Sequence, residues 1–95
     1  PKDIACRPGG EEFLVIMPET PNDLATVGAE RIRHAIASEP FLFERNNEEI
    51  EITISAGVAA HYSEGGLLAD FLHRADQALY KAKQNGRNRT EGLAA

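Results

Sequence analysis

The residues best suited to chemistry form a short turn near the start of the chain, Gly-Gly-Glu-Glu at residues 9–12. Apolar runs at residues 4–6 and 13–17 flank this turn and predict the two strands of a β-hairpin. Because glycine has no Cβ atom, a ligand or another backbone can come close to the turn. Two adjacent carboxylates there could hold a hard cation such as Mg²⁺ beside phosphates. From the spacing alone, a solvent-exposed acidic turn is the simpler interpretation, and both interpretations stay open here.

Two helices are predicted to follow this turn. The first begins with Pro21 at its first position and Asp23 in its first turn, and it ends near residues 38–39. The second spans about residues 67–84 and is followed by Asn-Gly at residues 85–86, a pair that suits a left-handed helix terminus. The side chains of the second helix that are expected to face a core are Leu68, Phe71, Leu72, Ala75, Leu79 and Ala82.

Short strands complete the predicted α/β pattern. Residues 41–43 and 49–55 predict an antiparallel hairpin, because the second run alternates apolar and polar side chains. Gly57 marks a bulge or a close approach of another backbone. Residues 63–66 form a connecting loop, and a last strand is expected around residues 88–93. The buried face of the alternating run would carry Ile50, Ile52 and Ile54.

Length and composition restrict the classes of protein that fit. The chain has 95 residues, which allow one small domain. A net charge of −5 without a Lys/Arg-rich run disfavours binding to nucleic acid or to a membrane surface. The single cysteine, Cys6, excludes an intramolecular disulfide and fits a reducing compartment, and we expect it to be packed in the apolar strand. No apolar run is long enough to span a membrane and no signal peptide is visible, so a cytoplasmic location is expected.

Two motifs resemble those of a known family. Residues 9–13, Gly-Gly-Glu-Glu-Phe, resemble the signature of the GGDEF-domain diguanylate cyclases in its GGEEF form. Residues 80–83, Tyr-Lys-Ala-Lys, and residues 86–88, Gly-Arg-Asn, are similar to the family's closing motif and follow in the expected order. The likeness is strongest to PleD-type response-regulator cyclases. It implies an α/β fold resembling the polymerase palm, with a ferredoxin-like core in which helices cover a mixed sheet.

The resemblance also implies a reaction and a cofactor. Two GTP molecules would be joined into cyclic di-GMP with release of pyrophosphate, by two domains that meet as a homodimer. Glu11 and Glu12 match acidic positions of the signature and would be catalytic ligands of Mg²⁺ or Mn²⁺. Gly9 and Gly10 would let the nucleotide lie against the hairpin backbone.

Two cations near the end of the chain match family positions that reach the terminal phosphates. These are Lys83, in the last turn of the second helix, and Arg87, just beyond it. The alternative is that they only complement the dipole at the helix C-terminus, an effect of about 0.3–1 kcal/mol. The histidines show no metal-ligand spacing and are expected to be surface or packing residues: His34, His61 and His73.

Asp3 and Arg31 match part of an inhibitory site for cyclic di-GMP that many family members carry. Asp3 falls on the Asp of the family's Arg-x-x-Asp pattern, whose Arg would precede Pro1. Arg31 matches a second arginine that grips the product in the PleD type. The alternative for Arg31 is an intrahelical pair with a neighbouring acid or plain solvent exposure, either of which contributes little to stability.

The resemblance leads us to expect that residues 1–95 are the C-terminal portion of one GGDEF domain, truncated at its N-terminus. The family's other metal-binding Asp and its guanine-reading residues would lie upstream, together with a sensory or receiver domain, so the chain alone should make no product. Strands next to a missing strand should expose apolar surface. The alternative function is a non-catalytic domain that binds nucleotide or cyclic di-GMP as a regulatory module. A third is a domain that serves only dimerisation or signal relay.

Overall fold

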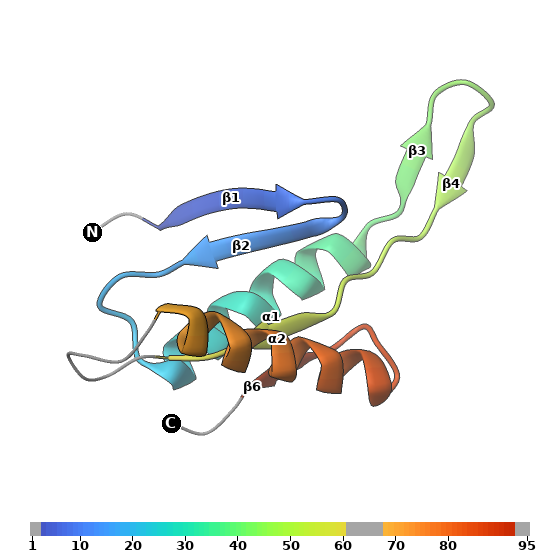
Figure 1. Cartoon of the computed structure of the whole chain (residues 1–95). Helices are drawn as coiled ribbons and strands as arrows, with labels where there is room; N and C mark the ends of the chain where they lie inside the picture. The colour runs from blue at the N-terminus through green and yellow to red at the C-terminus, as the bar shows by residue number, and fades with distance from the viewer. Residues whose placement is uncertain (1–2, 61–67, 93–95) are drawn as a thin grey trace.

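The computed structural model describes residues 3–60 and 68–92, and Figure 1 shows their arrangement. Strands and helices alternate along these residues, as the predicted α/β class requires. In chain order the elements are β1 (Ile4–Gly9), β2 (Glu12–Ile16), α1 (Asn22–Ser38), β3 (Phe41–Phe43), β4 (Glu48–Ile50), β5 (Ala56–Val58), α2 (Leu68–Gln84) and β6 (Thr90–Gly92).

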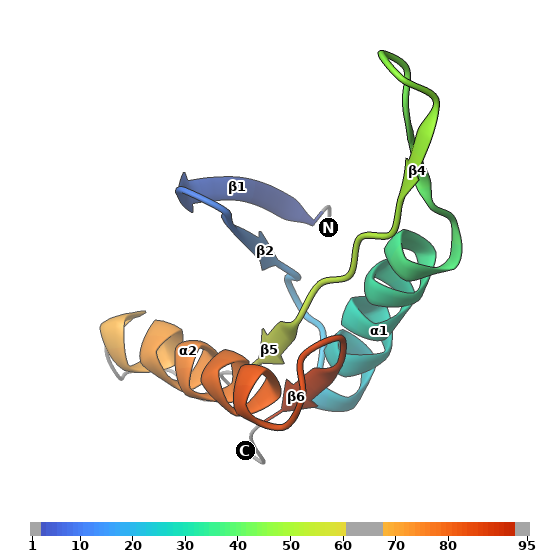
Figure 2. The same cartoon turned by 90° about the vertical axis from the view of Figure 1, so that its right-hand side faces the viewer.

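The packed part of the molecule consists of β5 and β6 with the two helices. β5 and β6 pair in parallel, with Ala56 opposite Thr90, and Figure 2 shows them between α1 and α2. A Cβ atom on Gly57 would lie 2.2 Å from the backbone nitrogen of Leu79, which confirms the predicted close backbone approach. On α2, Ala78 and Ala82 are fully buried.

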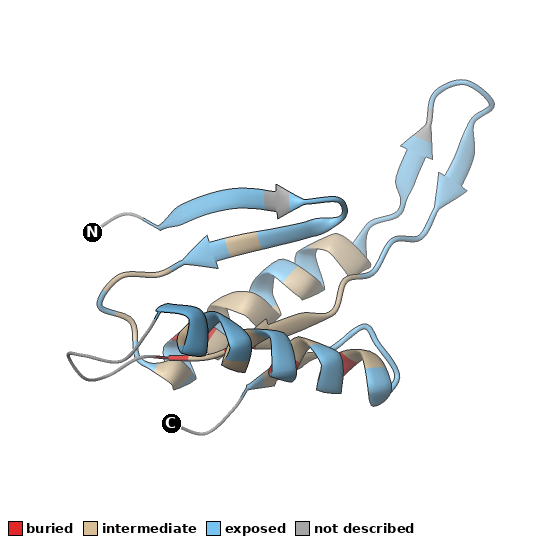
Figure 3. Ribbon diagram, in the orientation of Figure 1, coloured by how far each residue is buried: buried red, intermediate tan, exposed pale blue. Residues whose placement is uncertain are grey.

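The hairpin of β1 and β2 stands apart from this packed part. Its strands pair antiparallel and, among the described helices and strands, contact only each other. Just after β2, the Met17 side chain lies against α1. A Cβ atom added to Gly28 would be 3.3 Å from the Met17 Cε. Figure 3 shows that most of its residues are exposed, and the Phe13 side chain is 73% exposed. Cys6 is also exposed, so the prediction that it is packed was wrong.

The second hairpin, β3 with β4, is shorter than predicted. Phe41 pairs with Ile50, which confirms the antiparallel hairpin. However, the second strand ends at Ile50, and residues 51–55 form no strand. Ile50 and Ile52 are 41% and 40% exposed, so the predicted buried face of this run was wrong for both residues. The physical reason is that β4 contacts only β3 among the described elements, so nothing covers that face.

The core-facing side of α2 also differs from the prediction. Leu68 is 69% exposed and Leu72 is also exposed, whereas Ala78, which the pattern did not single out, is fully buried. The first turns of α2 extend beyond β5 (Figure 2), which agrees with the exposure of Leu68 and Leu72. The spacing of apolar residues therefore predicted the helix but not which of its apolar residues are buried.

The helix boundaries agree with the prediction to within about one residue. Pro21 is the N-cap of α1 rather than its first residue, with an extended backbone at φ −68° and ψ 163°. No side chain caps this end, and the Thr20 hydroxyl donates instead to the Pro18 carbonyl at 3.0 Å. The predicted connecting loop at residues 63–66, His61 and the last residue of the predicted final strand lie outside the described residues.

Candidate nucleotide and metal site

The acidic turn is a two-residue loop whose conformation depends on glycine. Gly9 pairs with Glu12, and Gly10 has a φ of +55°, a value that L side chains rarely adopt. A positive φ at the first central residue alone is typical of a type II′ turn. The register shifts between Cys6 and Gly9, so two residues of β1 lie opposite Phe13 alone and form a bulge.

The Arg7 side chain binds the backbone of this turn. Its Nε donates a hydrogen bond of 2.6 Å to the Gly10 carbonyl oxygen. Its guanidinium carbon also lies 5.6 Å from the centroid of the Phe13 ring, within cation–π range. Arg7 was not predicted from the sequence to have a role. The available signal was an arginine at the start of the glycine turn with an aromatic residue just after it.

The space beside the two glycines of the turn is open. Added Cβ atoms on Gly9 and Gly10 would meet nothing within 4 Å, and both glutamates are exposed. Neither the Glu11 nor the Glu12 carboxylate has a hydrogen bond or ion pair with another described residue. Such carboxylates suit Mg²⁺, which commonly takes one or two protein carboxylates and completes its shell with phosphate oxygens and water. In the described part of the chain, no three His, Cys, Asp or Glu side chains converge, so a cation here would need those outside ligands.

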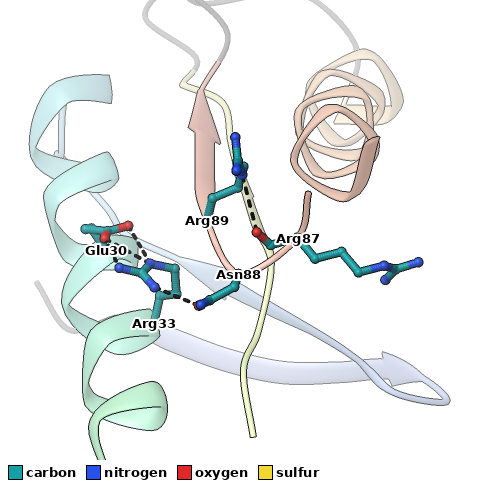
Figure 4. Close-up of polar contacts among 5 residues, drawn as sticks. All are labelled: Glu30, Arg33, Arg87, Asn88 and Arg89. Atoms are coloured by element: carbon teal, nitrogen blue, oxygen red, sulfur yellow. Dashed lines mark hydrogen bonds and ion pairs between the residues drawn. The ribbon is translucent and has the colours of Figure 1, made fainter. Parts of the chain in front are cut away.

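The predicted phosphate-binding cations lie where α2 ends. The Arg87 amide donates to the Ala82 carbonyl at 2.9 Å across the helix end, and Gly86 has a φ of +121°, which confirms the predicted glycine terminus. Lys83 is half-buried and Arg87 is exposed. Figure 4 shows the Arg87 side chain extending away from α1, and its guanidinium has no hydrogen bond or ion pair within the described residues.

A polar network joins α1 to the residues around Arg87. Arg33 donates from Nε to both carboxylate oxygens of Glu30 at 2.9 Å, and its Nη2 also contacts this carboxylate. Its Nη1 donates to Asn88 Oδ1 at 2.7 Å (Figure 4). The hydrogen bonds from Arg33 lower the pKa of Glu30 from 4.5 to about 2. This network was not predicted from the sequence, because residues 33 and 88 are 55 positions apart in the chain.

The structure does not join the two predicted inhibitory residues. Asp3 is exposed just before β1, and no hydrogen bond or ion pair links it to Arg31. Arg31 is exposed on α1, beside an open groove of about 420 Å³ that Thr26 and His34 also line. Since Glu30 pairs with Arg33, the neighbouring acid is already engaged and Arg31 faces solvent.

The two halves of the predicted nucleotide site are likewise separate. Among the described elements, β1 and β2 contact neither α2 nor β6, so Glu11 and Glu12 are not packed against Lys83 or Arg87. The structure therefore presents an acidic turn on one element and a cationic helix end on another.

No described helix is both long and apolar enough to cross a membrane.

Comparison with known proteins identifies the family. The family profile described as diguanylate cyclase, GGDEF domain, matches residues 1–89. The chain therefore belongs to the GGDEF family of diguanylate cyclases. The response regulator PleD of Caulobacter vibrioides is 46% identical over 93 residues, which are 98% of this chain and 20% of PleD. Diguanylate cyclase A of Treponema denticola is 40% identical over 87 residues, which are 92% of this chain and 23% of that protein.

Solved structures confirm the predicted fold class. The GGDEF domain of DgcB from Caulobacter crescentus, in complex with c-di-GMP, matches with a TM-score of 0.89 and 35% identity. That match covers 97% of this chain and 54% of the DgcB chain. The active GGEEF domain of a diguanylate cyclase from Vibrio cholerae matches with a TM-score of 0.83 and 41% identity, over 100% of this chain and 58% of that one. The chain thus spans somewhat more than half of these two solved chains and a fifth of PleD.

Proposed function

We propose that this chain is the C-terminal portion of the catalytic domain of a diguanylate cyclase, which condenses two GTP molecules into cyclic di-GMP and pyrophosphate. The single observation that carries the proposal is the open, glycine-formed turn that presents two unpaired carboxylates, Glu11 and Glu12. Relatives that are named diguanylate cyclases support it. We further propose that residues upstream of this chain supply the rest of the site, so that the chain alone is inactive.

In this function the acidic turn holds a divalent cation and the nucleotide phosphates. Glu11 and Glu12 would be the ligands that this chain gives to Mg²⁺ or Mn²⁺, and a bound cation would stabilise the negative charge that builds on the phosphate. Gly9 and Gly10 let the phosphates lie against the backbone, since no side chain occupies that space. Arg7 stabilises the conformation of the turn by donating a hydrogen bond to the Gly10 carbonyl.

Lys83 and Arg87 would bind the terminal phosphates of the same GTP. Binding there orients the leaving pyrophosphate and offsets its charge. Each 3′-hydroxyl then attacks the α-phosphate of the other nucleotide, so that one P–O bond forms and the bond to pyrophosphate breaks. The hydroxyl proton passes to Glu11 or to solvent. Because each domain holds one GTP, two copies must meet in a homodimer.

We also propose that Asp3 and Arg31 form part of an inhibitory site for cyclic di-GMP. Both side chains are exposed, and neither is committed to an ion pair within the described residues. The likeness to the DgcB domain, which is described in complex with c-di-GMP, supports a product-binding surface. The likeness to a protein named as a response regulator supports an upstream sensory or receiver domain and a cytoplasmic location.

The test separates catalysis from regulation. In the full-length protein, Glu11→Gln should abolish synthesis of cyclic di-GMP from GTP while cyclic di-GMP still binds, because the substitution removes a metal ligand and leaves Asp3 and Arg31 in place. Synthesis can be followed by chromatography and binding by calorimetry. Unchanged synthesis in Glu11→Gln would contradict the enzyme proposal. A wild-type protein that binds cyclic di-GMP but makes none would favour the alternative, a regulatory module.

A further inference from the structure

The turn that carries Arg87 has an unusual backbone. Gly86, Arg87 and Asn88 are three successive residues with positive φ, at +121°, +63° and +47°. Glycine adopts such values freely and asparagine tolerates them, but arginine seldom does. A backbone of this kind persists only where surrounding contacts fix it. The contacts that fix this turn therefore also decide where the Arg87 side chain starts.

The backbone on both sides of Arg87 is held by hydrogen bonds. On the α2 side, the Arg87 amide is bound to the Ala82 carbonyl. On the β6 side, Arg89 Nε donates to the Arg87 carbonyl at 3.3 Å, and the Ala56 amide of β5 donates to the Arg89 carbonyl at 3.0 Å. These bonds tie the turn to α2 and β5 but give it no link to α1.

The link to α1 is a side-chain hydrogen bond across 55 positions of the chain, from Arg33 to Asn88. The guanidinium of Arg33 is held in one orientation, because it binds both carboxylate oxygens of Glu30 and the Arg33 side chain is only 17% exposed. A guanidinium fixed in this way presents its remaining N–H groups in one direction. Asn88 thus receives its bond from a preset position.

We propose that the Arg33–Glu30 pair is a positioning device that, through Asn88, aims Arg87 at the nucleotide phosphates. Figure 4 shows Arg33 and Arg87 on opposite sides of the turn, so that Arg33 acts on Arg87 through Asn88. This inference rests on the proposed phosphate-binding role of Arg87. It adds that GTP affinity depends on two residues of α1 that lie outside the acidic turn.

The test measures binding of a non-hydrolysable GTP analogue with Mg²⁺ to the full-length protein by calorimetry. Arg33→Gln and Asn88→Gly should each weaken binding about tenfold, as expected for losing one hydrogen bond to a charged group. Glycine keeps the left-handed backbone and removes the side chain that accepts the bond. The matched control is Arg45→Gln, which removes an exposed arginine from the turn between β3 and β4.

A double-mutant cycle distinguishes aiming from general support of the fold. If Arg33 acts through Arg87, then Arg33→Gln should weaken binding no further once Arg87→Gln is present. An equal loss in both backgrounds, or no loss from Arg33→Gln and Asn88→Gly alone, would overturn the inference. If Arg33→Gln does not fold, Asn88→Gly gives the same cycle, because Asn88 is exposed. If Arg87→Gln binds as wild type, the phosphate role of Arg87 itself falls, and the inference falls with it.

Discussion

The two parts of the candidate site are built in opposite ways. The turn that carries Arg87 lies in the packed part, where β5, α1 and α2 all bond to it or to its neighbours. The acidic turn lies on a hairpin whose strands contact only each other among the described elements, and Arg7 fixes its conformation locally. The cationic half is therefore held by tertiary contacts, whereas the acidic half is held by its own strand pairing.

This difference predicts which substitutions change the free energy of unfolding and which change ligand affinity. Changes in the packed part should lower the free energy of unfolding, because burial and close backbone contacts are lost. Changes in the hairpin should leave that free energy almost unaltered and act on ligand affinity instead. The following predictions, measured in the full-length protein, test this division.

The largest effect on stability is expected from Gly57→Ala. The added Cβ would lie 2.2 Å from Leu79 N and 2.4 Å from Ala75 O, both backbone atoms that cannot move aside separately. We expect a loss of about 3 kcal/mol or more in the free energy of unfolding, measured by urea denaturation.

The matched variant in the hairpin is Gly9→Ala. Its Cβ would meet nothing within 4 Å, and Gly9 does not have a positive φ. The free energy of unfolding should change by less than about 0.5 kcal/mol, while binding of the GTP analogue weakens. Comparable destabilisation by both alanines would show that the two parts are not built differently.

A smaller effect is expected from Arg7→Gln. It removes the 2.6 Å hydrogen bond to the Gly10 carbonyl and the contact with Phe13, so the acidic turn loses its support. Affinity for the GTP analogue should fall about fivefold, which corresponds to about 1 kcal/mol, with little change in unfolding.

Arg74→Gln is the control for this change. The guanidinium carbon of Arg74 lies 5.7 Å from the centroid of the Phe71 ring. The substitution therefore removes the same kind of cation–π contact, but on α2, far from the acidic turn in sequence. It should leave affinity for the analogue unchanged. Equal losses from Arg7→Gln and Arg74→Gln would mean that Arg7 has no particular role at the turn.

The smallest effect concerns pH. Folding lowers the pKa of Glu30 from 4.5 to about 2, so its carboxylate contributes stability above pH 4.5 that is lost progressively as the pH falls towards 2. In Glu30→Gln, the midpoint of urea unfolding should therefore fall less steeply as the pH is lowered from about 6 to about 3. Glu49→Gln, which changes an exposed residue of β4 without an ion pair, should leave the decline as in wild type. An unaltered slope in Glu30→Gln would contradict a native-state role for the Glu30–Arg33 pair.

Local patterns predicted most of the elements but not what covers them. Alternation, helical spacing and the Asn-Gly terminus predicted the hairpins and the helices, and the glycine at position 57 predicted a bulge or the close approach that is observed. They gave the wrong buried faces for Ile52 and for Leu68, because burial depends on which element lies opposite. A periodic apolar stripe shows that a face can be buried, not that a partner is present.

The same limit applies to the candidate site. Gly10 and the two glutamates could be found from the sequence, since a glycine turn and adjacent acids are local features. Arg7 carried a weak signal, and the bond between Arg33 and Asn88 carried none, because it joins residues 55 positions apart. The sequence therefore indicated the groups that meet a ligand but not the contacts that hold them in place.

The central claim is that the acidic turn clamps a cation against nucleotide phosphates. It is tested most directly by crystals of the full-length protein with Mn²⁺ and a non-hydrolysable GTP analogue, using the anomalous signal of the metal. The account predicts a metal peak within about 2.5 Å of a Glu11 carboxylate oxygen, with phosphate oxygens in the same coordination shell. Bound nucleotide with no metal at the turn, and with both glutamates directed into solvent, would contradict it.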